Sequence, residues 1–304
     1  MSHKQRLLIA VGSMILIYDI SLAVHYVRLR GKMESVESRF RVELKERNKS
    51  APSSEISNRA NIARSYCWSG SDFFESPEML QACDAILHND ETQLRKLLDA
   101  QLEVNTTGKY GFTLLFWAFA CDNLQAFELL LEQGADPDRQ LKRSIAAGRY
   151  EFLYLMDSVL FSSAKRNNER FLLSGLKYSH DINRRDITGE NVLHVLTSPS
   201  SFGTFEVLNA AIAAGVDVNA ADGSGSTPVR RALGMGRFAV ALQLLKAGAD
   251  PRVGVDGLDG FKKSLDVASL RCQQRKEVEG SQQLDEIAKW LMLHFDIESN
   301  SNRI

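Results

Sequence analysis

Several residues of this 304-residue chain have types that could carry chemistry, but their spacing assembles no catalytic site. The four cysteines, Cys67, Cys83, Cys121 and Cys272, form no C-x-x-C pair, so neither zinc binding nor thioredoxin-like chemistry is indicated. Cys83 and Cys121 lie in helical patterns and are predicted to be small buried groups. A Cys67–Cys83 disulfide would require an oxidising compartment.

The common catalytic motifs are also missing from the sequence. It has no G-x-S-x-G elbow, no phosphate-binding P-loop and no H-E-x-x-H metal motif. Asp256 and Asp259 lack the remaining spacing of a calcium-binding EF-hand, so a surface loop is expected there. His194 is interpreted as a hydrogen-bonding structural residue. We therefore expect no enzyme activity, no cofactor and no metal.

Charge divides the chain into two parts. Residues 1–50 carry a net charge of +5, and residues 51–304 carry −6. This is a basic leader on an acidic body. Because nucleic-acid-binding domains are usually basic, no nucleic-acid partner is expected.

An apolar segment at residues 7–27 is predicted to be a single transmembrane helix, since 21 residues at 1.5 Å each span about 30 Å. Asp19 is either a tolerated polar residue or a contact to a partner helix within the membrane. A cleaved signal peptide is the alternative, but no A-x-A-like site is present and basic residues follow directly. The five basic residues after the segment favour a cytoplasmic body under the positive-inside rule, whereas a signal-anchor would export it.

The flanks of this segment are assigned by composition. Residues 1–6 and 297–304 are tails, residues 28–49 form a charged helical stalk, and residues 50–57 form a flexible linker. The stalk holds fewer than three heptads, so a single solvated helix is favoured over a coiled coil, and a weak dimer through anchor and stalk is the alternative.

Internal repeats fill most of the remaining chain. Gly-Ala-Asp-Pro recurs at 134–137 and 248–251, each time after a helix ending in Leu-Leu. Asn105 and position 138 are 33 residues apart, as are Asn219 and position 252. The steps between them measure 45 and 36 residues, which indicates insertions in two units.

These repeats resemble the ankyrin family, whose units carry G-x-T-P-L-H-x-A. The match is best at 225–232 and partial at 189–196 and 111–118. The resemblance covers roughly residues 76–295. It implies an all-α ankyrin-repeat solenoid at 58–296, with about five to six helix-pair units, short hairpin connectors and a preceding transmembrane helix. The expected units end near 105, 138, 183, 219, 252 and 295. The third unit departs from the pattern through its insertion, and the last through the polar stretch 273–283.

In ankyrin arrays the hairpin tips and first helices line the concave, partner-facing side, so basic and aromatic residues there are candidates for binding. Phe116 and Lys142 belong to the same elements. The alternatives are that these charges are solvated and locally paired, and that Trp117 belongs to the core. The candidate residues are Tyr110, Trp117, Arg139, Arg143, Arg184, Arg185, Arg230, Arg231 and Met235.

The sequence thus predicts a membrane-anchored module that binds a protein partner, with an acidic surface, as a scaffold or inhibitor. One alternative is an immunity protein that neutralises a secreted bacterial toxin, a resemblance of architecture only. Another is a regulatory or structural accessory of a membrane enzyme or transporter.

Overall fold

The computed structural model describes residues 62–65, 68–146, 152–198 and 205–295, all of which belong to one compact unit. The predicted membrane segment, stalk, linker and tails lie outside the described residues. Among the helices that are described, none has both the length and the apolar character needed to cross a membrane. The predictions for residues 1–57 therefore remain predictions.

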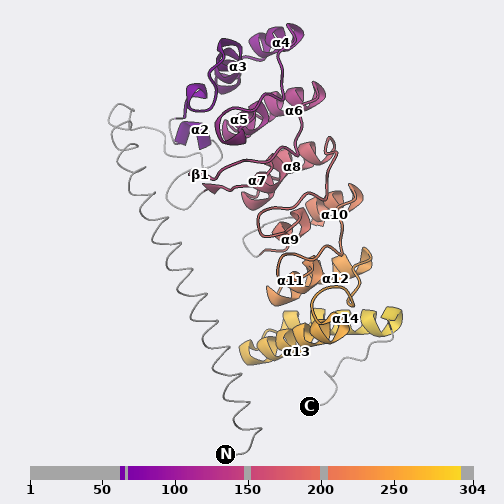
Figure 1. Cartoon of the computed structure of the whole chain (residues 1–304). Helices are drawn as coiled ribbons and strands as arrows, with labels where there is room; N and C mark the ends of the chain where they lie inside the picture. The colour runs from indigo at the N-terminus through magenta and orange to yellow at the C-terminus, as the bar shows by residue number, and fades with distance from the viewer. Residues whose placement is uncertain (1–61, 66–67, 147–151, 199–204, 296–304) are drawn as a thin grey trace, which may run out of the picture. The chain divides into compact units, whose positions relative to one another are not determined.

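The described helices form six pairs that follow one another in a stack (Figure 1). The pairs are α3 (Pro77–Leu87) with α4 (Glu91–Asp99), α5 (Leu114–Ala120) with α6 (Leu124–Glu132), α7 (Val159–Lys165) with α8 (Glu169–Leu176), α9 (Val192–Leu196) with α10 (Phe205–Ala213), α11 (Pro228–Gly234) with α12 (Phe238–Lys246), and α13 (Gly257–Arg275) with α14 (Val278–Phe295).

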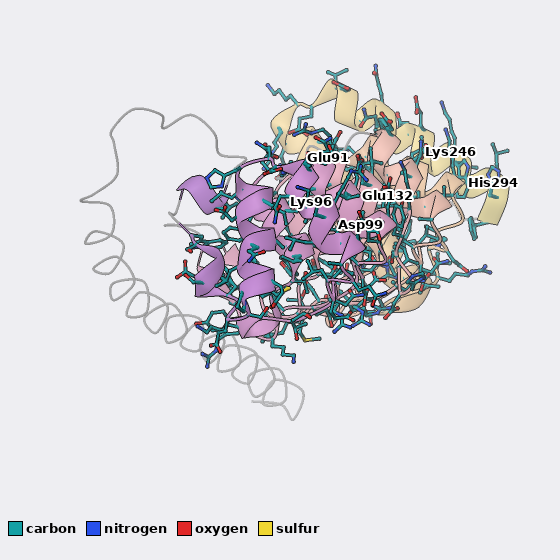
Figure 2. All side chains as sticks on the ribbon, turned by 90° about the horizontal axis from the view of Figure 1, so that it is seen from above. Glu91, Lys96, Asp99, Glu132, Lys246 and His294 are labelled. Atoms are coloured by element: carbon teal, nitrogen blue, oxygen red, sulfur yellow. The ribbon has the colours of Figure 1, made fainter. Side chains whose placement is uncertain are left out.

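The first helices of successive pairs pack on one another from α3 to α13, and the second helices lie on the other side of the stack (Figure 1). Three shorter turns complete the helical elements: α2 (Ile62–Ser65), η2 (Gly70–Asp72) and η3 (Lys109–Gly111). Figure 2 labels charged residues of the second helices, among them Lys96 of α4 and Lys246 of α12, both exposed.

Capping residues fix where the helices begin. Thr113 Oγ1 accepts a hydrogen bond from Phe116 N (3.3 Å), and Asn123 Oδ1 accepts one from Ala126 N (2.9 Å). Each bond satisfies an amide that has no partner within its helix. The short apolar runs of α5 and α6 therefore start at defined residues.

Glycines fix where second helices end. Gly134, Gly215 and Gly248 follow α6, α10 and α12 with φ of 84°, 91° and 99°, the left-handed conformation that commonly ends a helix. Thr227 precedes α11 as Thr113 precedes α5, but its side chain does not cap the helix. Its buried Oγ1 has no hydrogen-bond partner, and Pro228 supplies the preset φ at the first helical position instead.

Asparagines clamp each unit to the next. Asn105 Nδ2 donates to Gly134 O (2.9 Å), and Asn105 Oδ1 accepts from Asp136 N (2.8 Å). Asn183 and Asn219 make the equivalent two hydrogen bonds, each with the unit that follows it. The residues that set the sequence register therefore bind the glycine cap of the following unit.

Asp138 occupies the clamp position before the third pair. That pair lacks the Gly-Ala-Asp cap, and its turn offers three donors. Asp138 accepts hydrogen bonds from Ser179 Oγ (2.7 Å), His180 N (2.7 Å) and Asp181 N (2.8 Å). A carboxylate fits this turn because it accepts only, whereas an asparagine amide would also need an acceptor.

In contrast to the prediction from the sequence, the fold is not entirely α-helical. The twelve extra residues of the third unit include two short β-strands. Strands β1 (Ile145–Ala146) and β2 (Phe152–Leu153) pair antiparallel, with Ile145 opposite Leu153. Ile145 and Leu153 are buried, so the hairpin is attached to the body by its apolar side.

The buried apolar residues form two clusters that meet in the α7–α8 pair. The first cluster includes stacked rings of Phe73 and Phe112, whose centroids lie 4.0 Å apart. Val159 and Phe171 belong to the first cluster, whereas Leu160 belongs to the second. No pair could bury both of its faces alone, so the neighbours are required.

Candidate functional site

The connections that precede the first helices form a continuous row, here named the tip row. It comprises residues 105–113, 139–146, 152–157, 183–191, 219–227 and 252–256. Hydrogen bonds join each tip to the next. They run from Lys142 N to Tyr110 O (2.7 Å), Gln140 Nε2 to Arg185 O (2.8 Å), Gly223 N to Thr188 O (2.9 Å) and Val255 N to Gly225 O (2.8 Å).

Apolar side chains are exposed along this row. Their exposed fractions range from 38% to 59%, although each tip is tied to its neighbours. Exposed apolar groups on a rigid support are typical of protein-binding surfaces. The residues are Tyr110, Tyr154, Met156, Ile187 and Val255.

Two tip carboxylates, those of Asp222 and Asp186, accept hydrogen bonds within their own turns. Asp222 Oδ1 accepts from Ser224 N (2.8 Å), Ser224 Oγ (2.7 Å) and Ser226 N (2.9 Å). Burial alone would raise the pKa of Asp222, but these hydrogen bonds outweigh burial and lower its pKa. Asp186 binds Thr188 in the same way, and its pKa is also lowered against the effect of burial. The carboxylates of Asp222 and Asp186 are therefore held by hydrogen bonds within their own tips.

The first helices contribute little surface. Every residue of α5 and α9 is buried. The expectation that first helices line the partner-facing side is therefore wrong for these two helices, and the surface belongs to the tips. Small and apolar residues fill the helices because they pack between neighbouring pairs.

Trp117 is a core residue, so its prediction as a binding residue is wrong. Its side chain is 0% exposed, and Nε1 donates to Cys83 O at 2.8 Å. Phe116, beside it, is also buried. A helical pattern of Leu-Leu-Phe-Trp-Ala-Phe-Ala is apolar all round, which is typical of a buried helix.

Arg230 is likewise structural, which corrects its prediction as a groove residue. It is 6% exposed, and its guanidinium donates to the carbonyl oxygens of Val255 and Gly257. These bonds attach the α11 helix to the loop before α13. A Cβ at Gly254 would lie 3.3 Å from this guanidinium, so the loop closes tightly over it.

Arg231 and Arg185 are largely occupied by internal contacts. Arg231 pairs with Glu190, at the start of the neighbouring first helix. Arg185 Nη1 donates to Gly189 O (2.9 Å) and to Ala221 O. Both residues join neighbouring tips, so we remove them from the candidate binding surface.

Arg139, Arg143 and Arg184 remain accessible on the tips. Arg139 and Arg184 make exposed ion pairs with Asp136 (3.6 Å) and Asp181 (3.0 Å), which lie three residues away in the chain. Exposed pairs of this kind are weak and readily exchanged. These three arginines can therefore meet a partner's carboxylates.

Met235 is exposed, but it lies away from the tip row. It follows Gly234 at the end of α11, and the tip lies before Pro228 at the other end. Seven helical residues separate the two ends by about 10 Å. Met235 is therefore not part of this surface.

Sequence reasoning missed the inserted hairpin and its exposed residues Tyr154 and Met156, as well as Ile187 and Val255. The 45-residue step located the insertion but gave no strand pattern, since each strand has only two residues. Ile187 and Val255 stand singly between polar residues, which leaves no periodic signal.

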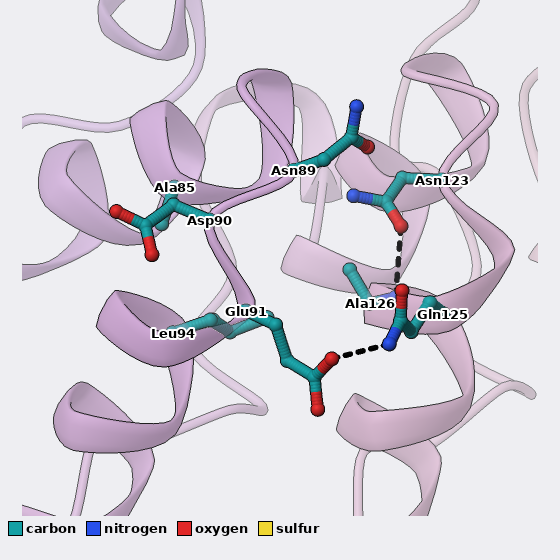
Figure 3. A pocket seen from close by; sticks show the side chains of 8 residues that line it. All are labelled: Ala85, Asn89, Asp90, Glu91, Leu94, Asn123, Gln125 and Ala126. Carbon is teal, nitrogen blue, oxygen red and sulfur yellow. Dashed lines mark hydrogen bonds between the residues drawn. The ribbon is translucent and has the colours of Figure 1, made fainter.

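Among the described residues, neither His194, nor a metal-binding cluster, nor the small hollow beside Glu91 competes with the tip row. His194 is 0% exposed and binds Ser226 O through Nε2 (3.0 Å), as its structural interpretation predicted. The described residues hold no group of His, Cys, Asp or Glu side chains placed to bind a metal. A hollow beside Asn89, Glu91 and Gln125 measures about 10 Å³, the space of roughly one water molecule (Figure 3). Glu91 and Gln125 close it by hydrogen bonding across two units.

Stacked helix pairs joined by tips and glycine caps define the ankyrin-repeat fold, and the comparisons with known proteins agree. Residues 110–141 match the family model described as Ankyrin repeat. An ankyrin repeat domain from Acinetobacter baumannii superposes with a TM-score of 0.51 at 22% identity. The match covers 66% of this chain and 94% of that one, and it shows the fold alone. A search of curated proteins found no match.

Proposed function

We propose that this chain is a membrane-tethered interaction module whose tip row binds an acidic surface of a protein partner, as a scaffold or an inhibitor. Ankyrin repeats generally mediate protein–protein interaction. The observation that carries the proposal is the tip row itself. It exposes apolar side chains, binds the carboxylates of Asp186 and Asp222 within their own turns, and leaves Arg139, Arg143 and Arg184 accessible.

Charge supports an acidic partner. Cations at the rim of an interface act mainly on the rate of encounter, and salt weakens their effect. A partner with a negative surface would therefore associate faster with this row than a neutral one. The proposed role is binding and not catalysis.

A photo-crosslinking amino acid at Ile187, in the full-length chain in its native cells, identifies the partner. Ile187 is 59% exposed on the tip row. The control position is Leu293, which is 82% exposed on α14. We expect one protein to crosslink from position 187 and not from 293. Equal crosslinking from both positions contradicts a tip-row site.

Binding kinetics with that partner test the charges. Reversing Arg139, Arg143 and Arg184 together to glutamate should slow association at low salt and have less effect at high salt. A matched control reverses Lys96, Arg170 and Lys246, three exposed cations of the second helices, with the same change in net charge. If both triple variants slow association equally, the effect is one of net charge, and the tip-row proposal fails.

The tether is tested separately. Deleting residues 1–30 should move the chain from carbonate-washed membranes to the supernatant. A body that stays in the pellet would contradict the proposed anchor. We propose a cytoplasmic body, which C-terminal alkaline phosphatase and fluorescent-protein fusions distinguish from an exported one.

A further inference from the structure

We infer that the inserted hairpin turns one part of the tip row into a docking surface for an acidic segment that carries an aromatic or aliphatic side chain. This surface, named the hairpin platform, consists of Tyr110, Lys142, Arg143 and Met156. The inference rests on the proposed function and states which chemistry of the partner the row would recognise.

The backbone of the insertion brings these residues together. Lys142 N donates to Tyr110 O (2.7 Å), and Met156 N donates to Leu141 O (2.8 Å). Tyr110 and Met156 therefore flank the Leu141–Lys142 dipeptide on opposite sides. The N–H and the C=O of this single peptide unit point in opposite directions, so the two apolar residues lie on either side of one backbone segment.

Both apolar residues have a left-handed backbone. The φ values are 64° for Tyr110 and 63° for Met156, and their exposed fractions are 41% and 38%. A bulky side chain at positive φ is disfavoured, and such residues concentrate at functional sites. The other positive-φ residues besides glycine, within the described ranges, are all polar: Asn89, Gln101, Asp122, Asn167, Asp256 and Lys276.

Tight packing holds the first of these residues in place. Gly111, next to Tyr110, has a φ of 79°, and a Cβ there would lie 3.0 Å from Gln140 O and from Lys142 N. No larger residue could bring the tip this close to the insertion. The platform is therefore built on a rigid support, which lowers the entropy lost on binding.

The charge of the platform indicates the complementary charge of its ligand. Lys142 and Arg143 are exposed and form no ion pair with the described acidic residues. The Arg143 guanidinium lies 6.0 Å from the centre of the Tyr110 ring, a cation–π distance that leaves its N–H groups accessible. The neighbouring carboxylates of Asp157 and Asp186 are already paired with Lys165. Positive charge that has no ion-pair partner among the described residues, beside two apolar side chains, thus fits an acidic segment with one apolar anchor.

Labelled peptides test this fit with the full-length chain in detergent micelles. The probe is a fluorescein-labelled 12-residue Glu/Asp peptide with a central Trp. The comparison peptides replace that Trp with Ser, or every acidic residue with Lys. We expect the acidic Trp peptide to bind best, by fluorescence anisotropy, and both comparison peptides to bind at least about tenfold more weakly.

Methionine methyl NMR locates the bound peptide. Met156 and Met235 are exposed to similar extents, 38% and 46%, but only Met156 belongs to the platform. We expect the methyl resonance of Met156 to shift on titration and that of Met235 to stay in place. A larger shift at Met235, or equal binding of the Ser peptide, overturns the inference. Preferential binding of a single-stranded RNA of equal length also overturns it.

Substitutions that keep the backbone conformation separate docking from folding. Asparagine tolerates positive φ, so the double variant Tyr110→Asn with Met156→Asn removes the apolar groups and retains the turns. We expect about tenfold weaker binding of the acidic Trp peptide, through faster dissociation, with Met235→Ser as the unchanged control.

Binding of the partner identified by crosslinking distinguishes the platform inference from the proposed function. If the charge-reversed triple variant loses this partner and the double asparagine variant binds it normally, the platform inference fails and the proposed function stands. If neither variant affects the partner, both fail.

Discussion

The ammonium group of Lys165 lies 2.7 Å from Oδ1 of Asp157, a carboxylate whose side chain is only 1% exposed. The same ammonium lies 3.1 Å from Asp186, so one cation serves the base of the inserted hairpin and the following tip. Burial raises the pKa of Asp157 to about 6, although the charge of Lys165 opposes this rise. Burial alone would lower the pKa of Lys165, but the two carboxylates outweigh it and raise the pKa.

Replacing this cation, as Lys165→Met, should destabilise the chain by roughly 3–5 kcal/mol at pH 7, because two buried carboxylates lose their counter-charge. Burial already holds the folded pKa of Asp157 above its unfolded value, and loss of the Lys165 charge should raise it further, so protonation stabilises the variant more than the parent. The deficit of the variant should therefore shrink as pH falls from 7 to 5. Urea denaturation at both pH values measures it, and Lys165→Met with Asp157→Asn should recover part of the loss at pH 7. A deficit that grows on acidification contradicts this account.

Arg230 and Arg184 should respond differently to the same substitution. Arg230→Met removes a 6% exposed side chain and leaves the carbonyl oxygens of Val255 and Gly257 without its guanidinium donors, for a loss of roughly 2–4 kcal/mol. Arg184→Met removes an exposed pair and one long hydrogen bond to Gln140 (3.4 Å), and should cost less than about 1 kcal/mol. Free energies of unfolding from urea titration compare them. Similar losses for both would show that Arg230 does not attach the loop to α11.

Two aromatic residues of the second unit, Trp117 in the core and Tyr110 on the tip, should also respond differently to substitution. Trp117→Phe creates a cavity and removes the side-chain hydrogen bond to Cys83 O, for a loss of about 2–3 kcal/mol. Tyr110→Asn should change stability by less than about 0.5 kcal/mol, since asparagine accepts its φ of 64°. Thermal midpoints measured side by side check this. A stable Trp117→Phe protein would argue against the burial of this ring.

Two glycines near the fifth pair provide a matched test of backbone conformation. Gly248→Val should lose about 1 kcal/mol or more, because φ is 99° and a β-branched residue avoids that region. Gly234→Ala, at the helical end of α11 with no atom within 4 Å of the added Cβ, should gain about 0.4–1 kcal/mol. Opposite shifts of the urea midpoint are expected. Shifts of the same sign would count against the assigned caps.

The stack of helix pairs could be predicted from the sequence, because the residues that recur in the sequence are those that form hydrogen bonds between neighbouring units. Asn105 and Asn219 lie 33 residues before the equivalent positions 138 and 252. Each of the two asparagines forms a hydrogen bond to the glycine cap of the next unit, at 134 and 248. The binding surface was harder to predict, since exposure depends on neighbours in space. Trp117 and Arg230 have the residue types of a binding site, yet both are enclosed by adjacent units. Two-residue strands in the insertion leave no periodicity that a sequence could reveal.

The asparagine clamps give the tips of the row a regular spacing, with one exception. Asn105, Asn183 and Asn219 hold the next unit through the same pair of atoms, so each of these three clamps sets its step in the same way. Asp138 holds a different turn, and the step that it controls is also the one widened by the inserted hairpin. A partner that lies along the row therefore meets one unlike interval among similar ones. For the partner proposed above, only one alignment would place its apolar and acidic groups opposite that interval, and a slip by one unit would misplace them all.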